Sequence, residues 1–464
     1  MAVAPFAVAG IALLFLRWSA MAAGGASLVT ALTGAFLWPG FEVGGVTGAV
    51  LAGLGTGANV LYILAGGLFL FNVLSAGGAV ERVSAFLGEI EPERDGLALL
   101  VVVGVAPFFE SVTGFGVAVV ISAPILLSAG FSPLRAAALA SWGQVAVPWG
   151  ALGVGTLIGA DLAGVSFGRL SDASAWMTLP LFPVYGLAAV ALAGGVTAVR
   201  NRFAEVLFVS LAGGAGVLLC SLFLAPALSG AAGGLASVAA FLVPRAERLR
   251  GLRVPYRALV PYGVLLILLA ISNGPKAVRE GLAFLGPVLS GPGTWLLVSA
   301  AFVVVFFRLE PVDMSGTAMD TLRQWAPVSA AIVAFILADQ VVAASGAAAL
   351  LAGGVAGALG KLYPAAAPFV GALGGALTGS SAGSNALFMP LQTEAAATSG
   401  HQTLPLAALQ NVSGSQATML APQRVVLAAT AAGIPDKEAE VVRAVATPVI
   451  VSLAILVLIG ALRV

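Results

Sequence analysis

Long runs of apolar residues, separated by short polar or charged stretches, make up most of this 464-residue chain. A helix that crosses a membrane needs about 20 predominantly apolar residues, and by that measure the pattern predicts about twelve crossings. They fall near residues 3–16, 20–38, 46–74, 133–158, 177–198, 203–224, 228–243, 258–272, 293–307, 325–344, 404–432 and 444–462. The predicted fold class is therefore an all-α polytopic membrane protein.

Three further apolar stretches are interrupted by glycine, proline or hydroxyl residues, at 97–129, 345–360 and 365–390. Interrupted segments of this kind are typical of hairpins that enter a membrane and leave on the same side, because irregular backbone is tolerated there only where it is buried in protein or lines a cavity. We expect two such re-entrant hairpins, near 104–130 and 365–395.

Composition narrows the class of protein. The chain is 60% hydrophobic and 9% charged, whereas soluble domains carry about 25% charged residues. A net charge of +1 without a basic domain argues against nucleic-acid binding. One cysteine, Cys220, and one histidine, His401, provide neither a disulfide framework nor a zinc motif, so no cofactor or metal is predicted. We expect a multi-pass protein of the plasma (cytoplasmic or inner) membrane of a prokaryote.

Charged loops indicate the orientation of the chain. The loop Pro244–Arg257, PRAERLRGLRVPYR, carries five arginines and one glutamate and should be cytoplasmic by the positive-inside rule. Arg200 and Arg202 lie two crossings earlier and should share its side. The loop from Glu81 to Asp95 is acidic, and acidic residues count for little in this rule. The rule therefore does not assign this loop to a side of the membrane.

Two halves, 1–240 and 241–464, show a weak repeat within one integrated membrane domain. The stretch GFSPLRAAALASWGQ from Gly130 and the stretch GHQTLPLAALQNVSG from Gly400 share four residues at a constant offset of 270. Four identities in alanine-rich sequence can also arise by chance.

The order of the polar breaks supports the repeat more strongly. ESVTGFG (110–116) and TGSSAGSN (378–385) precede the two matched stretches, and WGQVAVPWG (142–150) and QNVSGSQATMLAPQ (410–423) follow them. Paired helix interruptions in two inverted halves are typical of secondary transporters, which hold the substrate between them near the bilayer midplane.

The polar stretch 378–385 is the first candidate binding segment. Its glycines permit close backbone approach, its hydroxyls supply hydrogen bonds, and we expect Asn385 to cap a helix that begins at Ala386. A helix N-terminus suits a carboxylate. Packing of small residues between helices is the alternative. The candidate substrate-binding residues here are Thr378, Gly379, Ser380, Ser381, Ser384 and Asn385.

The stretch around Glu110 is the second candidate. Glu110 is the only acidic residue between Gly96 and Ala160, and an ionisable group at membrane depth is a functional hypothesis by default. Burial favours the neutral form of a carboxyl, so Glu110 is a candidate for proton coupling. Asp339 is a second, although each can instead have a structural role or lie at a helix end. Substrate-binding candidates beside Glu110 are Ser111, Thr113, Gly114 and Gly116.

The later breaks supply the remaining candidates, Gln144, Asn411, Ser413 and Arg424. The guanidinium of Arg424 follows Pro422 and can meet a substrate carboxylate or pair with Glu110 or Asp339. Snorkelling of its side chain to the membrane surface is the alternative.

Two blocks of the sequence resemble the lactate permease family. PFFESVTGFGVAVVISAPILLSAGFSPLRAAALA is similar to its first hairpin region. LTGSSAGSNALFMPLQ and the following QNVSGSQATMLAPQRVVLAATAAGIPDKEAEVVR are similar to its second hairpin and the broken helix after it. The resemblance covers most of the chain and implies proton-coupled uptake of L-lactate and related 2-hydroxymonocarboxylates such as glycolate. It also implies the fold of the ion-transporter superfamily, with inverted repeats, an elevator-like motion and, by analogy, a homodimer.

The resemblance also carries residues over. Glu110, Gly114, Phe115 and Gly116 keep the first motif, and other matches are Thr378, Gly379, Ser380, Ser384, Asn385, Ala386, Leu387, Asn411, Ser413, Gly414, Pro422 and Gln423. Four positions depart from the family pattern. Ser381 stands where an aspartate is usual, Gly143 and Gln144 replace an Asn-Thr pair, and Arg424 replaces a small hydroxyl residue. These changes make the site more positive, which also fits a different organic anion.

Three function classes remain to be weighed. A membrane-embedded enzyme would need a nucleophile and base or a metal cluster, for which the sequence offers no candidates, so no enzymatic activity is expected. A passive anion channel on the same fold is an alternative that only transport against a gradient excludes. We predict a secondary active transporter whose partners are a small carboxylate, protons and the lipid bilayer.

Overall fold

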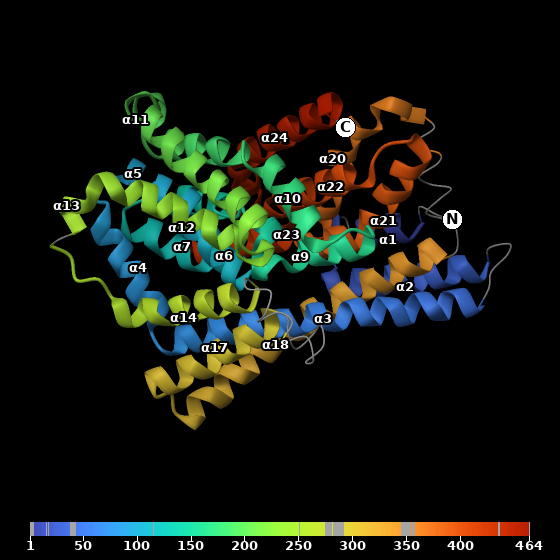
Figure 1. Cartoon of the computed structure of the whole chain (residues 1–464), viewed down its shortest axis with the longest axis horizontal. Coiled ribbons are helices and arrows are strands. Elements are labelled where there is room, and N and C mark those ends of the chain that lie inside the picture. The colour runs from blue at the N-terminus through green and yellow to red at the C-terminus, as the bar shows by residue number, and fades with distance from the viewer. Residues whose placement is uncertain are drawn as a thin grey trace.

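The computed structural model describes residues 4–14, 16, 18–37, 43–114, 116–249, 251–273, 281, 292–344, 354, 358–434 and 437–463. Within these ranges the regular structure is entirely helical (Figure 1), as the apolar runs predict. The first half contains α1 (Ala4–Leu14), α2 (Ala20–Phe36), α3 (Val43–Ala76), α4 (Ala79–Ile90), α5 (Arg94–Leu100), η1 (Val101–Val105), α6 (Ala106–Thr113), α7 (Val117–Ser128), α8 (Pro133–Trp142), η2 (Val147–Trp149), α9 (Gly150–Leu162), α10 (Phe167–Thr178), α11 (Leu181–Phe223), η3 (Pro226–Leu228) and α12 (Ser229–Leu242).

The second half is likewise helical where the structure describes it. It contains η4 (Val243–Arg245), α13 (Ala246–Leu249), α14 (Tyr256–Asn273), α17 (Pro292–Phe307), α18 (Pro311–Ala344), η6 (Gly360–Leu362), α20 (Tyr363–Thr378), α21 (Ser381–Ser399), α22 (Thr403–Ala417), η7 (Thr418–Leu420), α23 (Pro422–Ala431) and α24 (Glu438–Arg463).

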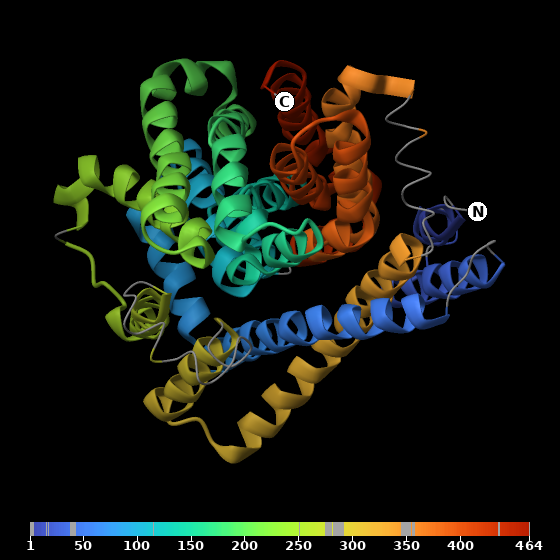
Figure 2. The same ribbon diagram turned by 45° about the vertical axis from the view of Figure 1, so that its right-hand side comes forward.

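The helices form two bodies, which Figure 2 separates. One is a slanted layer in which α18 packs along α2 and α3, and α17 packs against α3 and α14. The other holds the hairpins and broken helices, with α21 against α9 and α10 against α22. Each body therefore combines helices from both halves of the sequence.

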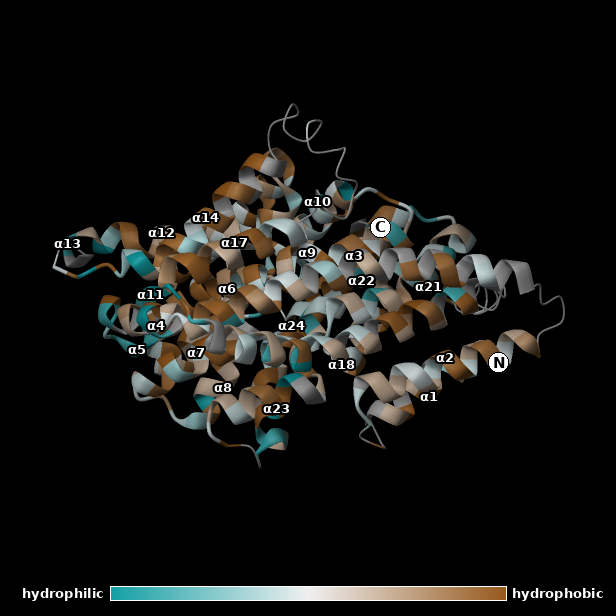
Figure 3. Cartoon of the chain, turned by 90° about the horizontal axis from the view of Figure 1, so that it is seen from below, coloured by the Kyte–Doolittle hydropathy of each residue, from teal (hydrophilic) through white to brown (hydrophobic). Residues whose placement is uncertain are grey.

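Helix length and composition support a membrane protein. In the described part, five segments are long and apolar enough to cross a membrane, and the bent pair α8 and η2–α9 makes a sixth if it counts as one span. The five are Arg94–Thr113, Leu181–Phe223, Pro226–Arg245, Met314–Ala338 and Glu438–Leu462. Figure 3 shows apolar residues along most helices, and polar residues near α13, α4 and α5. The total of twelve crossings stays a prediction.

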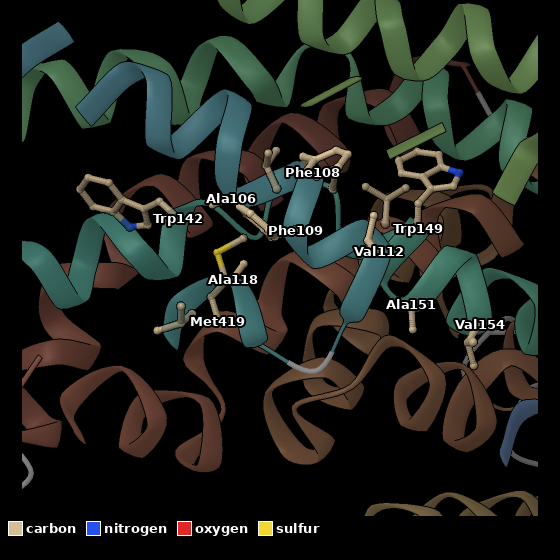
Figure 4. Close-up of a cluster of buried hydrophobic side chains, with 14 of the residues drawn as sticks. Ala106, Phe108, Phe109, Val112, Ala118, Trp142, Trp149, Ala151, Val154 and Met419 are labelled. Atoms are coloured by element: carbon tan, nitrogen blue, oxygen red, sulfur yellow. The ribbon is translucent and has the colours of Figure 1, made fainter. Parts of the chain in front are cut away.

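The first predicted hairpin consists of α6 and α7. The two helices pack against each other and are joined at Gly114–Gly116, where both glycines have positive φ, +72° and +83°. A π-helical turn, η1, precedes α6, and Pro107 has no amide hydrogen to continue a regular α-helical ladder there. Figure 4 shows Phe108, Phe109 and Val112 of α6 in one buried cluster with Trp149.

The segment predicted as one crossing at 133–158 is broken. α8 ends at Trp142, and the chain resumes as η2 and α9 after a bend of 65°. Ala151 and Leu152 have left-handed backbone angles, with φ of +48° and +60°, and Gly153 follows at +84°. Such angles cost about 1–3 kcal/mol for a residue with a side chain and persist only where the surroundings impose them.

The second half repeats this order of elements. α20 and α21 form a hairpin around Gly379, and the segment predicted as one crossing at 404–432 is likewise interrupted, by η7 between α22 and α23. Gly130 and Gly400, matched in the sequence, both follow the second helix of their hairpins with positive φ, +82° and +74°. The paired order of hairpin and broken helix is therefore present in both halves.

Ion pairs gather at one end of the second body. Arg202 pairs with Glu93, with Asp95 at 3.1 Å and with Glu205 at 2.8 Å, and Arg245 also pairs with Glu205. Because Arg202 and Arg245 share one carboxylate, the two arginine segments lie close together, which is compatible with the prediction that they share one side of the membrane. The acidic loop, whose side the sequence left open, lies at this end too.

Replacing Arg245 should destabilise this end of the molecule. Its guanidinium lies 2.7 Å from a carboxylate oxygen of Glu91, which is 1% exposed, and 3.8 Å from the centre of the Phe241 ring. We expect Arg245→Gln to cost about 2 kcal/mol or more, because a buried carboxylate loses its ion pair. Thermal unfolding in detergent measures the loss. Arg253→Gln, at an exposed arginine of the same loop, is the matched control, and an equal effect of both changes would contradict the prediction.

Candidate functional site

The guanidinium of Arg424 connects all four interrupted segments. Arg424 lies in the first turn of α23 and is 6% exposed. Its Nε donates to the carbonyl of Gly379 at the tip of the second hairpin (2.8 Å), and its Nη1 donates to Oε1 of Gln144 in the break after α8 (2.9 Å). Nη1 also lies 3.4 Å from Oε1 of Glu110 on the first hairpin.

Glu110 is fixed by the backbone of its own hairpin. The Gly116 amide lies within hydrogen-bond distance of both carboxylate oxygens, at 3.2 and 3.1 Å. Glu110 is 1% exposed and projects from the last turn of α6. A charge so deeply buried needs a partner, and Arg424 is that partner. Of the alternatives for Arg424, the structure supports pairing with Glu110 over snorkelling.

The N-terminus of α21 points at the same place. Ser380 is its N-cap, and the side chain of Ser380 accepts from the Gly383 amide. The expectation that Asn385 caps a helix beginning at Ala386 is therefore wrong, because the helix starts one turn earlier, at Ser381. In the described part of the chain, the amides of Ser381 and Ala382 have no hydrogen-bond acceptor, as is usual in the first turn of a helix.

A cavity of about 20 Å³ lies among these groups. Glu110, Arg424, Ser380, Ser381 and Ala382 line it together with Val147, Gly150, Val154 and Gly155. This volume holds about one water molecule, so a three-carbon acid requires the surrounding segments to move apart.

Sequence reasoning missed the contribution of α9. The left-handed turn at Ala151–Gly153 brings Gly150 beside Glu110 and places Gly155 against the tip of α21, where a Cβ on Gly155 would lie 2.1 Å from Ser381 Oγ. The signal was the glycine-rich run GALGVG at 150–155, which follows the polar break that ends at Gly150.

Asn385 and Asn411 belong to a separate buried network. Asn385 Nδ2 donates to Gly155 O (2.9 Å) and Asn411 Oδ1 (2.8 Å), and Asn411 Nδ2 donates to Thr156 and Ser174 hydroxyls. This network ties α21 and α22 to α9 and α10 behind the cavity. Neither asparagine lines the cavity, so we assign both a positioning role.

The structure places other predicted residues away from the cavity. Several hydroxyls donate to carbonyls within their own helices or hairpin: Ser111 to Pro107, Thr113 to Phe109, Thr378 to Gly374 and Ser380, Ser384 to Gly371, and Ser413 to Leu409. Gly114 packs against Ala151. The backbone of Asp339 is part of α18, but its side chain lies outside the described residues, as does Phe115.

Comparison with known proteins places this arrangement in a family. The sequence pattern of the L-lactate permease family matches residues 1–246 and 257–464. The chain belongs to the L-lactate permease family. It is 25% identical to the L-lactate permease of Escherichia coli K12 over 93% of this chain and 89% of that relative. It is 23% identical to the L-lactate permease of Streptococcus iniae, over 73% and 77%, and 26% identical to the glycolate permease GlcA of Escherichia coli K12, over 83% and 80%.

In this member of the L-lactate permease family, three of the positions expected to depart from the family pattern, Gln144, Ser381 and Arg424, lie close together. Arg424 donates to Gln144, and Ser381 lines the cavity beside Arg424. The resemblance stated from the sequence is confirmed, and the expectation of a membrane-embedded permease is supported by the family and by the apolar helices.

Proposed function

We propose that this protein is a secondary active transporter that takes up L-lactate or a related 2-hydroxymonocarboxylate together with protons. One observation carries the proposal: a buried arginine, a buried glutamate and the N-terminus of a helix surround one cavity where four interrupted segments meet. The family relationship supplies the class of substrate, because the relatives are L-lactate and glycolate permeases.

The substrate carboxylate would bind between Arg424 and the start of α21. Arg424 uses Nε and Nη1 for its contacts within the protein, and Nη2 has no hydrogen-bond partner in the described part of the chain. The amides of Ser381 and Ala382 supply further donors and the partial positive charge of the helix terminus. The Ser381 hydroxyl would bond to the hydroxy group on carbon 2, and Glu110 would carry the proton.

Alternating access would move the site across the membrane. We propose an elevator-like displacement of the body with the hairpins against the layer of α2, α3, α14, α17 and α18. The two-body arrangement and the paired hairpins support this motion. We also propose two inverted repeats, about twelve crossings, residence in a bacterial inner membrane with the Arg245 end cytoplasmic, and a homodimer.

Uptake by purified protein in liposomes tests the function. We expect labelled L-lactate to accumulate above its external concentration when the outside is more acidic than the inside. When the proton gradient is collapsed, the internal concentration should rise no higher than the external one. Competition by unlabelled glycolate, pyruvate and a dicarboxylate ranks the substrates, and protein-free liposomes provide the background. Equilibration without accumulation under an inward proton gradient would instead identify a passive facilitator.

A different organic anion is the second candidate substrate. Arg424 and Gln144, which the resemblance implies are replaced in this chain, form the hydrogen bond at the centre of the site. Such a site favours an anion with more acceptor atoms than lactate. Preferential competition by a dicarboxylate in the same assay would support this candidate over L-lactate.

A further inference from the structure

We infer that Glu110 serves as an internal substitute for the substrate carboxylate, so that a proton on Glu110 releases Arg424 to bind the anion. The inference rests on the proposed transport function and specifies how the proton and the anion are coupled within that site. Three observations carry it: the contacts of the Arg424 guanidinium, the hydrogen bond from the Gly116 amide to the Glu110 carboxylate, and the charges near Glu110 and Arg424.

The Arg424 guanidinium keeps its position whether or not Glu110 is charged. Its contacts to Gly379 and Gln144, at 2.8 and 2.9 Å, are to neutral oxygens, whereas the contact to Glu110 is longer, at 3.4 Å. Loss of the Glu110 charge therefore leaves two of the three contacts in place. The charge of the arginine then lacks a counter-ion at an exposure of 6%, and an unpaired buried charge is strongly unfavourable.

Glu110 is likewise held in either state. The Gly116 amide donates to its carboxyl group, and a neutral carboxyl still accepts such a bond. The side chain has no need to leave its place when it takes up a proton. What changes is the charge beside Arg424, from a balanced pair to a single cation.

Among the described residues that line the cavity, Glu110 and Arg424 are the two that carry a charge. Several elements pack against α6. Two of them, α7 and α12, carry no titratable residue. Asp161 lies at the exposed end of α9, Tyr62 of α3 hydrogen-bonds to Thr294, and the Tyr262 ring packs on Phe108 and Phe109. The charge at the cavity is therefore set by Glu110 and Arg424.

Proton and anion binding should then reinforce each other. A protonated Glu110 leaves a net charge of about +1 that an anion neutralises, and a bound anion makes the charged form of Glu110 unfavourable. By linkage, each ligand must strengthen the other by the same factor. The anion dissociation constant should fall roughly tenfold per pH unit of acidification while free Glu110 is ionised, and then level off.

Equilibrium binding to detergent-purified protein tests this coupling. Radiolabelled L-lactate and formate are the probes, since formate offers a carboxylate without the hydroxy group. We expect the affinity for both to rise with acidification in the wild-type protein. In Glu110→Gln, which mimics the protonated state, the affinity should be independent of pH and near the wild-type value at low pH. Glu81→Gln, at an exposed acid, is the matched control. His401→Gln, which removes the chain's single histidine, is a second control.

The outcomes separate the coupling from the substrate. A wild-type affinity that does not change with pH, or a pH dependence that persists in Glu110→Gln, overturns the inference even if L-lactate is transported. Linked binding of formate without binding of L-lactate supports the coupling and overturns L-lactate as the substrate. Failure of both probes to bind at any pH overturns the inference, because the inference requires the guanidinium beside a protonated Glu110 to bind a small carboxylate.

Discussion

Arg424→Gln is expected to reduce L-lactate uptake about 100-fold or more, since truncation of one member of a buried, hydrogen-bonded charge pair costs about 2–5 kcal/mol. Arg424 contacts Gly379, Gln144 and Glu110 simultaneously, so its loss removes the anion's counter-ion and the connection between the hairpins. Arg424→Lys should retain part of the activity, because it keeps the charge but not the planar fork of donors. Initial rates of uptake at saturating and limiting substrate measure both changes.

The matched control is Arg443→Gln, which neutralises an exposed arginine on α24. Size-exclusion profiles and unfolding temperatures of all variants establish whether each remains folded. Normal uptake by folded Arg424→Gln protein would leave Arg424 with a structural role only.

Gly155→Ala is the second change with a large expected effect. The added Cβ would lie 2.1 Å from Ser381 Oγ and 3.0 Å from the Ala382 amide nitrogen, within the cavity. Overpacking of this kind typically costs about 1–3 kcal/mol. The N-terminus of α21 must move to accommodate the methyl group, and we expect uptake to fall by about tenfold or more.

Gly263→Ala tests whether the effect is local to the cavity. Gly263 lies on α14, and a Cβ there would meet nothing within 4 Å, so uptake should be unaffected. Uptake and unfolding temperature are measured together for both variants. A fall in stability of Gly155→Ala with an unchanged rate per folded molecule would show that Gly155 serves packing alone.

Much of the fold follows from patterns that are local in the sequence. Apolar runs of sufficient length form helices, and the clusters of glycine and hydroxyl residues at 110–116 and 378–385 mark where these helices turn back. The same local reading failed at the start of α21. Ser380 and Asn385 are both good capping residues, and only the backbone angles, extended at Ser380, decide between them.

Hydroxyl residues were the least predictable part of the site. Serine and threonine in a helix can turn toward a ligand or donate to a carbonyl one turn earlier, and their identity does not distinguish the two. The hydroxyls of Ser111, Thr113 and Ser413 donate to carbonyls one turn earlier in their helices. Ser381, in the first turn of its helix, lines the cavity instead.

The sequence by itself determined that the chain is an all-helical membrane protein with interrupted helices. It also singled out Glu110 and Arg424, because charged residues in apolar surroundings stand out without any knowledge of the fold. Only the tertiary structure decided that these two side chains, 314 residues apart, face each other. It also brought Gly155 and Gln144 to the same place. Such pairings depend on how the two halves pack together, and no local periodicity encodes which of several buried partners a long arginine side chain will reach.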